Sequence, residues 1–413
     1  MIDRNGNNLI FLLCAPRSGS SLATVMLQNH SKIFATQEMW FLMSLYDMKL
    51  TPHRAYGGTG ILNQFFNGVL PGETYEQACR AFALQVYNGL LQSSGADMVV
   101  DKSPRYYYLL EFLDALFPHS RRIWLIRNPL SVIASYKKVY QDTNDRFNLK
   151  EDLLNPKFDI KMIDITVGLL RYMDYFSGGS SYAYRLSYES MVARPEEELR
   201  MLCRFLGLTY EEGLDKYGDF MNTAKADLYY SMGVGDPFVA QHTQPHLGSV
   251  DSWKEVLDKR EIEMYCRVLG AEVFHKLGYS RQLAEAESLT GASFEMKPDM
   301  ELIQMRTRQL AGATGCRWEE NYRMKTDAPA EGRLFQAEPG DMRTMINPQV
   351  LQLQITLRSL EKRLEKSYAT QKHLAAQLDA VKKKINRLKS MIPFGRHLSQ
   401  WASNYLIHSG RKK

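Results

Sequence analysis

Residues 15–21 carry the residue types that bind a phosphate-like anion. Arg17 offers charged donors in one plane, and neighbouring hydroxyl and backbone N–H groups add further donors. An apolar run at residues 9–14 predicts a buried strand, and apolar residues at helical spacing follow from Leu22. A helix N-terminus therefore adds free N–H groups and a positive dipole end. The donors besides Arg17 come from Ser18, Gly19, Ser20 and Ser21. The alternative is an ordinary strand-turn-helix corner.

A second pair of anion-binding residues lies about 110 residues further along the chain. The apolar run at residues 122–127 predicts another buried strand, and Asn128 and Pro129 are favoured at the start of a helix. Arg127 at the strand end and Ser135 about two turns into the helix can then reach one phosphate from different sides. A serine that faces the core is the alternative for Ser135.

Two further charged residues follow short predicted strands. Glu38 comes after residues 33–36, and Lys102 comes just past residues 98–100. In open parallel sheets, ligands bind at the carboxyl ends of the strands, which is where both residues are expected. The alternatives are a solvated loop carboxylate for Glu38 and a surface lysine for Lys102.

The sequence PRSGSS at residues 16–21 resembles the 5′-phosphosulfate loop of sulfotransferases, and IRNPLSVIASY at residues 126–136 resembles their 3′-phosphate element. Those enzymes use 3′-phosphoadenosine 5′-phosphosulfate (PAPS) and need no metal. The nucleotide triphosphatase loop G-x-x-x-x-G-K-[ST] places lysine after glycine, whereas here Arg17 precedes it. The resemblance implies that residues 17–21 hold the 5′-phosphosulfate and that Arg127 and Ser135 hold the 3′-phosphate.

Two later segments extend the resemblance. Tyr188 begins the segment YESMV, which is followed by PEEEL and then CRFLGL. This order resembles the family, in which the corresponding tyrosine lies near the adenine. A tyrosine that only packs in the core is an equal alternative for Tyr188. The sequence HLGSVDSWK at residues 246–254 resembles the closing segment of the family, whose serine, tryptophan and basic residues pack on or contact the donor. Ser249 and Ser252 are both candidates for that serine, and Lys254 is the basic residue.

The pattern is most similar to the branch that includes the tyrosylprotein sulfotransferases, because Glu38 follows Arg17 at the interval of that branch's catalytic carboxylate. The resemblance implies that Glu38 takes the proton from an acceptor hydroxyl and that Lys102, in D-K-S-P, neutralises the leaving oxygen. The cytosolic small-molecule branch uses a downstream histidine instead. No histidine closely follows Lys102, and His119 lies behind a predicted helix, so a histidine base is not expected.

The predicted fold is α/β, a P-loop-type parallel sheet flanked by helices, followed by a linker and a C-terminal coiled-coil helix. We expect a sulfotransferase domain at residues 1–280, a linker with short helices at 281–349, a coiled coil at 350–393 and a basic amphipathic tail at 394–413. The predicted seam alternates at +3 and +4, with polar breaks at two positions. Its positions are Leu353, Leu357, Leu360, Leu364, Ser367, Gln371, Leu374, Leu378, Val381, Ile385, Leu388 and Ile392. A lone amphipathic helix folded onto the body is the alternative.

The basic charge belongs to the tail. The chain has a net charge of +6, but residues 350–413 alone carry 14 Lys and Arg against 3 Asp and Glu. The body is therefore acidic overall, which gives no support for nucleic-acid binding. Trp401 and Tyr405 lie among the basic residues of the tail, which favours contact with a membrane surface or a partner. Simple solvation of the lysines is the alternative.

The cysteine pattern and the hydropathy of the chain indicate the cellular compartment of the protein. The five cysteines are scattered and lack metal-ligand spacing, which predicts reduced thiols. No signal-peptide pattern is visible, and no apolar run approaches the ~18 residues of a membrane span. We therefore expect a cytoplasmic protein.

The sequence thus predicts a metal-independent enzyme that moves a sulfuryl group from PAPS to the hydroxyl of a carbohydrate, a lipid or a tyrosine. A phosphotransferase with a degenerate P-loop is one alternative, but ATP has no 3′-phosphate for Arg127 and Ser135. A non-catalytic coiled-coil scaffold is the other. The tail predicts a homo-oligomer with possible peripheral membrane contact.

Overall fold

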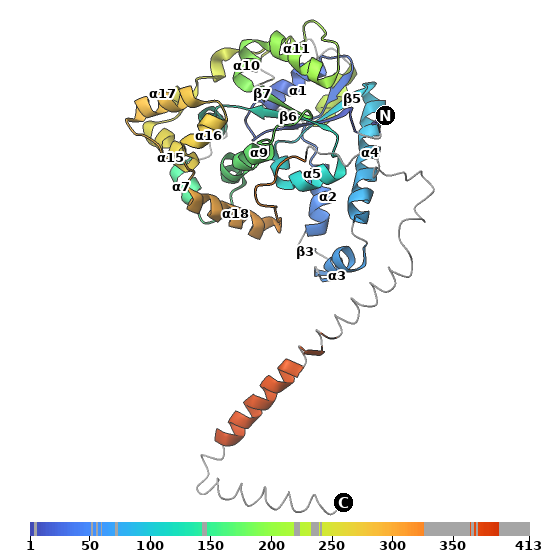
Figure 1. Ribbon diagram of the computed structural model, residues 1–413, viewed down its shortest axis with the longest axis vertical. Coiled ribbons are helices and arrows are strands. Elements are labelled where there is room, and N and C mark those ends of the chain that lie inside the picture. Colours follow the sequence, from blue (N-terminus) through green and yellow to red (C-terminus); the bar gives the residue numbers. More distant parts are fainter. Residues whose placement is uncertain are drawn as a thin grey trace, which may run out of the picture. The chain divides into compact units, whose positions relative to one another are not determined.

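The computed structural model describes most of the chain in two compact units (Figure 1). The first unit is Met1–Phe66 with Leu70–Phe335, and the second is Asn67–Val69 with Gln336–Lys413. The described residues are 1–3, 6–50, 53–54, 57–58, 60–70, 73–142, 147–218, 224–232, 239, 242–325, 364, 367–368 and 371–387.

A five-stranded parallel sheet forms the centre of the first unit, as the sequence predicts. In spatial order its strands are β2 (Ile33–Ala35), β5 (Met98–Lys102), β1 (Leu9–Leu13), β6 (Arg121–Ile126) and β7 (Ala183–Ser187). The central strand β1 lies between β5 and β6 and is buried along its whole length. Because all neighbouring strands are parallel, their carboxyl ends meet at one edge.

Helices cover both faces of this sheet (Figure 1). Side chains of β1 alternate between the two hydrophobic cores, as the period of a strand requires. Ile10 and Leu12 pack in the core under α1 (Ser20–Gln28), α10 (Tyr188–Ala193) and α11 (Pro195–Leu206). Phe11 and its alternate neighbours pack in the other. The helices of that second face include α4 (Thr74–Ser94), η2 (Pro104–Leu109), α5 (Leu110–Leu116), α6 (Pro129–Asp142) and α9 (Leu169–Tyr175).

Several predicted elements differ in detail. Strand β5 extends to Lys102, so this residue ends the strand instead of following it. The helix predicted over residues 160–175 contains a π-helical turn, and the segment predicted as a loop at 215–245 contains α12 (Ala224–Ser231). The elements concerned are α8 (Ile160–Ile163), η3 (Asp164–Gly168) and α9. Among the described residues, the remaining elements up to residue 279 are α2 (Phe41–Leu50), β3 (His53–Arg54), β4 (Gly57–Gly58), α3 (Gly60–Gln64), η1 (Phe65–Val69), α7 (Leu149–Leu154), η5 (Leu247–Ser249), α14 (Trp253–Val256), α15 (Lys259–Leu269) and α16 (Ala271–Lys276).

The first compact unit continues past the predicted boundary at residue 280. Helix α17 (Ser280–Thr290) packs on α15 and α16, and α18 (Met300–Thr314) packs on α8 and η3. The guanidinium of Arg306 in α18 is fully buried and donates hydrogen bonds to the carbonyls of Asp152 and Leu153. Buried leucine and isoleucine side chains of α18 explain why this segment joins the body, although its sequence lacks a clear period.

In the second unit, residues 371–387 are helical, and the predicted seam residues within them are exposed. Those residues are Gln371, Leu374, Leu378, Val381 and Ile385. The seam positions Leu353, Leu357, Leu360, Leu388 and Ile392 lie outside the described residues, as does the tail at 394–413. Among the described helices, none is both long enough and apolar enough to cross a bilayer. All five cysteines are free thiols and are buried.

Replacing Arg306 tests whether α18 belongs to the cooperative body. We expect Arg306→Ala to lower the free energy of unfolding by about 2–4 kcal/mol, because it leaves buried carbonyls unpaired. Arg308→Ala, at an exposed position of the same helix, is the matched control and should change it by less than about 0.5 kcal/mol. Chemical denaturation measures both. Equally small effects would show that α18 does not stabilise the body.

Candidate active site

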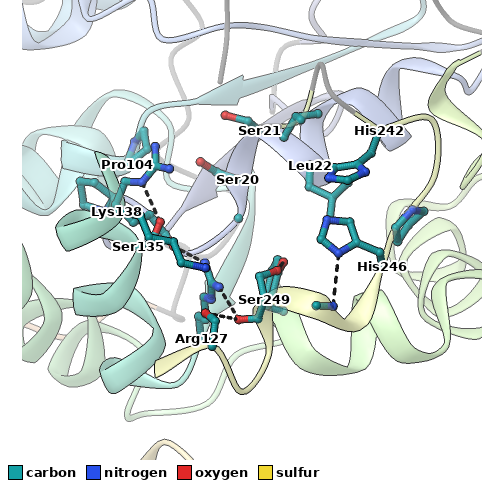
Figure 2. A pocket seen from close by; sticks show the side chains of 18 of the residues that line it. Ser20, Ser21, Leu22, Pro104, Arg127, Ser135, Lys138, His242, His246 and Ser249 are labelled. Atoms are coloured by element: carbon teal, nitrogen blue, oxygen red, sulfur yellow. Dashed lines mark hydrogen bonds between the residues drawn. The ribbon is translucent and has the colours of Figure 1, made fainter. Parts of the chain in front are cut away.

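A cavity of about 350 Å³ opens at the carboxyl ends of β1 and β6 (Figure 2). It is bounded by the loop before α1, by α6, by Tyr188 at the start of α10 and by the segment around η5. The lining residues therefore come from segments that are far apart in sequence. The described lining residues carry one carboxylate, Glu38, against several basic groups.

The loop before α1 has an unusual backbone. Arg17 has a φ of 69°, and Gly19, which caps α1, has a φ of 97°. A Cβ atom on Gly19 would lie 2.3 Å from the ring of Tyr188, so only glycine allows this approach. No side chain caps α1 among the described residues, which leaves its first N–H groups for a ligand.

Arg127 connects this loop to the other walls of the cavity. Its guanidinium donates to the carbonyl of Arg17 and to the carbonyl of Ser249, both at 2.9 Å. The guanidinium also lies 4.2 Å from the ring centre of Tyr188, whose hydroxyl is 2.6 Å from Ser249 Oγ. Burial lowers the pKa of Arg127, yet arginine stays charged in proteins. Its charge therefore lies directly behind the loop.

Helix α6 supplies two more polar groups. The Arg17 Nε donates to Ser135 Oγ at 3.1 Å, although the two residues are 118 positions apart. Lys138 lies one turn further along α6 and also lines the cavity. Figure 2 shows Ser135 and Lys138 on the side of the cavity opposite His242 and His246.

Glu38 and Lys102 form an ion pair at the edge of the cavity. The Lys102 Nζ is 3.4 Å from Glu38 Oε1, with the lysine side chain buried and the glutamate partly exposed. The neighbouring Asp101 is fully buried and accepts hydrogen bonds from the hydroxyls of Tyr87 and Tyr106. Burial raises the pKa of Asp101. These bonds fix the end of β5 and thereby the position of Lys102.

Ten of the predicted site residues line this one cavity. They are Arg17, Gly19, Ser20, Ser21, Glu38, Arg127, Ser135, Tyr188, Ser249 and Ser252. Of the others, Ser18 lies in the loop with its side chain buried, and Lys102 contacts the lining residue Glu38. Lys254 does not line the cavity, because its Nζ is ion-paired with Glu285 at 2.8 Å.

Other lining residues were not singled out from the sequence. Lys138 follows Ser135 by one helical turn, a spacing that could have identified it. Tyr217 and His242 come from a segment without periodicity, which offers no signal, and His246 begins the segment HLGSVDSWK, in which only the serines, the tryptophan and the lysine match the resemblance. The two histidine rings are 4.1 Å apart, and His246 Nδ1 accepts a hydrogen bond from the N–H of Gly248. Burial, followed by the nearby His242, lowers the pKa of His246.

This arrangement can bind a ligand that carries more than one anionic group. Backbone N–H groups and Arg17 offer donors for one anionic group, and Arg127, Ser135 and Lys138 line the same cavity and offer donors for a second. Rings of Tyr188, Tyr217 and the two histidines give the same cavity an aromatic part. The described residues contain no cluster of metal-ligating side chains.

Comparison with known proteins agrees with this chemistry. Residues 9–212 match the model of the Sulfotransferase family. This part of the chain belongs to the sulfotransferase family. The matched range includes Arg17, Glu38, Lys102, Arg127, Ser135 and Lys138.

Individual relatives of the sulfotransferase domain are distant. The nodulation protein NoeE of Sinorhizobium fredii is 26% identical over 67% of this chain and 67% of its own. Protein-tyrosine sulfotransferase 1 of Danio rerio is 24% identical over 52% of this chain and 58% of its own. The sulfotransferase domain of the curacin biosynthetic pathway, a solved structure, is 23% identical over 62% of this chain and 95% of its own, with a TM-score of 0.43. The chain thus spans only part of these curated relatives.

Proposed function

We propose that this protein transfers a sulfuryl group from PAPS to an acceptor hydroxyl. The observation that carries the proposal is the pairing of two anion sites in one cavity, one at the loop of residues 16–21 and one at Arg127 and Ser135. PAPS carries a 5′-phosphosulfate and a 3′-phosphate on one adenosine, so each site receives one of them. A nucleoside triphosphate has no anionic group for the second site.

The donor's parts follow from the chemistry of the cavity walls. The first N–H groups of α1 and Arg17 bind the 5′-phosphosulfate. Two of the five N–H donors of Arg127 are used by backbone carbonyls, so the others remain for a phosphate oxygen. Lys138 adds a second cation beside Ser135. The adenine stacks against the aromatic part of the cavity, next to Tyr188.

Transfer of the sulfuryl group resembles phosphoryl transfer, with in-line displacement and a loose transition state. The acceptor oxygen forms a bond to sulfur as the bond between sulfur and the bridging oxygen breaks. Lys102 neutralises charge on that bridging oxygen, and Glu38 takes the acceptor's proton. The products are the sulfated acceptor and adenosine 3′,5′-bisphosphate. The contact between Lys102 and Glu38 supports these two roles, because it holds the cation for the leaving oxygen and the proton acceptor at the same end of the cavity.

The acceptor presents a hydroxyl on a carbohydrate, a lipid or a tyrosine. The name of the Danio rerio relative specifies protein tyrosine, which makes a tyrosine hydroxyl one candidate here. The five buried free thiols support a reducing compartment, so we assign the protein to the cytoplasm.

We further propose that residues 350–393 associate as a coiled coil between copies of the chain. The exposed Leu374, Leu378, Val381 and Ile385 support this proposal, because such an apolar stripe is stabilised by a partner helix. Lys382, Lys383, Lys384 and Arg387 lie at the end of the described helix, where positive charge suits both the helix dipole and an anionic membrane surface.

The donor prediction concerns affinity. Adenosine 3′,5′-bisphosphate should bind tightly in calorimetry, and ATP should bind much more weakly. Arg127→Ala should weaken binding of the bisphosphate by about 1.5–3 kcal/mol, the range for a charged hydrogen bond. Lys254→Ala is the matched control, since Lys254 pairs with Glu285 outside the cavity. Binding of ATP as tight as that of the bisphosphate would contradict the proposed donor.

The second prediction concerns the proton acceptor. Glu38→Gln keeps the shape of the side chain but removes the base, so turnover should fall about 10²- to 10⁴-fold. Affinity for adenosine 3′,5′-bisphosphate should be retained. Transfer of labelled sulfate from PAPS onto one fixed fraction of cell extract measures turnover. Unchanged turnover would show that another residue takes the proton.

The third prediction concerns the tail. Truncation after Pro348 should lower the oligomeric state in analytical ultracentrifugation and leave binding of adenosine 3′,5′-bisphosphate unchanged. The full-length chain should float with anionic liposomes at low salt, and the truncated chain should not. A full-length monomer at micromolar concentration would refute the coiled coil. Failure to float would refute the membrane contact.

A further inference from the structure

The carboxylate of Glu38 is held by two different donors. Its Oε2 accepts a hydrogen bond from the indole N–H of Trp40 at 3.0 Å, and its Oε1 faces Lys102 Nζ at 3.4 Å. A well-formed bond between ammonium and carboxylate is shorter, about 2.7–2.9 Å. The contact with Lys102 is therefore loose, whereas the bond to Trp40 has an ordinary length.

Trp40 is held in a strained backbone conformation. Its φ is 55°, a value that is rare for a residue with a bulky side chain. Such strained backbone conformations are enriched at functional sites. The carbonyl of Trp40 accepts a hydrogen bond from the N–H of Ser44 in the first turn of α2, at 3.0 Å. The start of α2 therefore fixes the backbone that carries the indole.

The indole ring is also held from the side. The guanidinium of Arg105 lies 5.8 Å from the ring centre of Trp40. Arg105 donates to both carboxylate oxygens of Asp164, at 2.9 Å from its NH2 group and 3.1 Å from Nε. Asp164 is fully buried in the π-helical turn and also accepts hydrogen bonds from the hydroxyls of Tyr107 and Tyr136. This network extends from the core to Glu38.

We propose that Trp40 is a positioning residue that orients the Glu38 carboxylate for proton transfer. The hydrogen bond from the indole N–H holds Oε2 beside Trp40. The carboxylate therefore cannot rotate to form a short ion pair with Lys102. Oε1 then remains directed to the end of the cavity where the acceptor hydroxyl and the leaving oxygen meet. The inference rests on the proposed role of Glu38 as the base, and it adds a residue that does not itself line the cavity.

Trp40→Phe tests this role because it keeps a ring beside Arg105 and removes only the N–H donor. We expect turnover, measured as labelled-sulfate transfer from PAPS onto a fixed extract fraction, to fall about 3- to 30-fold. The KM for PAPS and the melting temperature should not change. Trp318→Phe is the matched control: Trp318 donates to the carbonyl of Tyr108 and lies under Arg171, outside the cavity. It should leave turnover unchanged.

A double-mutant cycle separates positioning from a general structural effect. If Trp40 acts through Glu38, Trp40→Phe should cause no further loss of turnover in the Glu38→Gln protein. A loss as large as in the wild-type background would overturn the proposal. So would unchanged turnover in Trp40→Phe alone.

The indole bond can also be observed without activity. In a ¹⁵N-tryptophan-labelled protein, the indole N–H signal that disappears in Trp40→Phe belongs to Trp40. That signal should shift in Glu38→Ala and stay in place in Lys254→Ala. No shift in Glu38→Ala would overturn the proposal even if Glu38→Gln abolishes turnover. A shift together with full turnover in Glu38→Gln would instead overturn the proposed base, and the positioning role with it.

Discussion

The buried guanidinium of Arg127 is the interaction on which the cavity depends. It bonds to the carbonyls of Arg17 and Ser249 and stacks on the ring of Tyr188, three segments that are distant in sequence. A buried charge is costly unless it is well bonded, so these segments are stable together rather than singly. Gly19 completes the arrangement, since any side chain there would collide with Tyr188.

Electrostatics explain which ligand this cavity suits. Arg17, Arg127 and Lys138 face it, and Glu38 is the one carboxylate among its described lining residues. Positive charge therefore exceeds negative charge among the described lining residues, which suits an anionic ligand. The net charge of +6 comes from residues 350–413, because the rest of the chain is acidic overall.

The sequence predicts those cavity residues that belong to a local motif of strand, loop and helix. The loop of residues 16–21 and the pair Arg127 and Ser135 follow buried apolar strands, whose parallel arrangement brings them together. Contacts that depend on tertiary packing could not be predicted. The ion pair of Lys254 in α14 with Glu285 in α17 needs two helices whose relative placement no local pattern encodes.

The same limit applies to the end of the body. Helix α18 packs on the body through buried Leu302, Ile303 and Leu310 and through the buried Arg306, which donates to two carbonyls of α7. A buried arginine reads in sequence as a surface residue. The sequence therefore predicts a linker with short helices at residues 281–349, whereas α18 belongs to the same compact unit as the sheet.

The central claim is that one cavity binds both phosphates of the donor. A crystal structure of the full-length chain with adenosine 3′,5′-bisphosphate tests it most directly. We predict the 5′-phosphate at the N-terminus of α1 and the 3′-phosphate within hydrogen-bond distance of Arg127 and Ser135. A nucleotide bound in the cavity with its 3′-phosphate away from both residues, or bound elsewhere, would contradict the account.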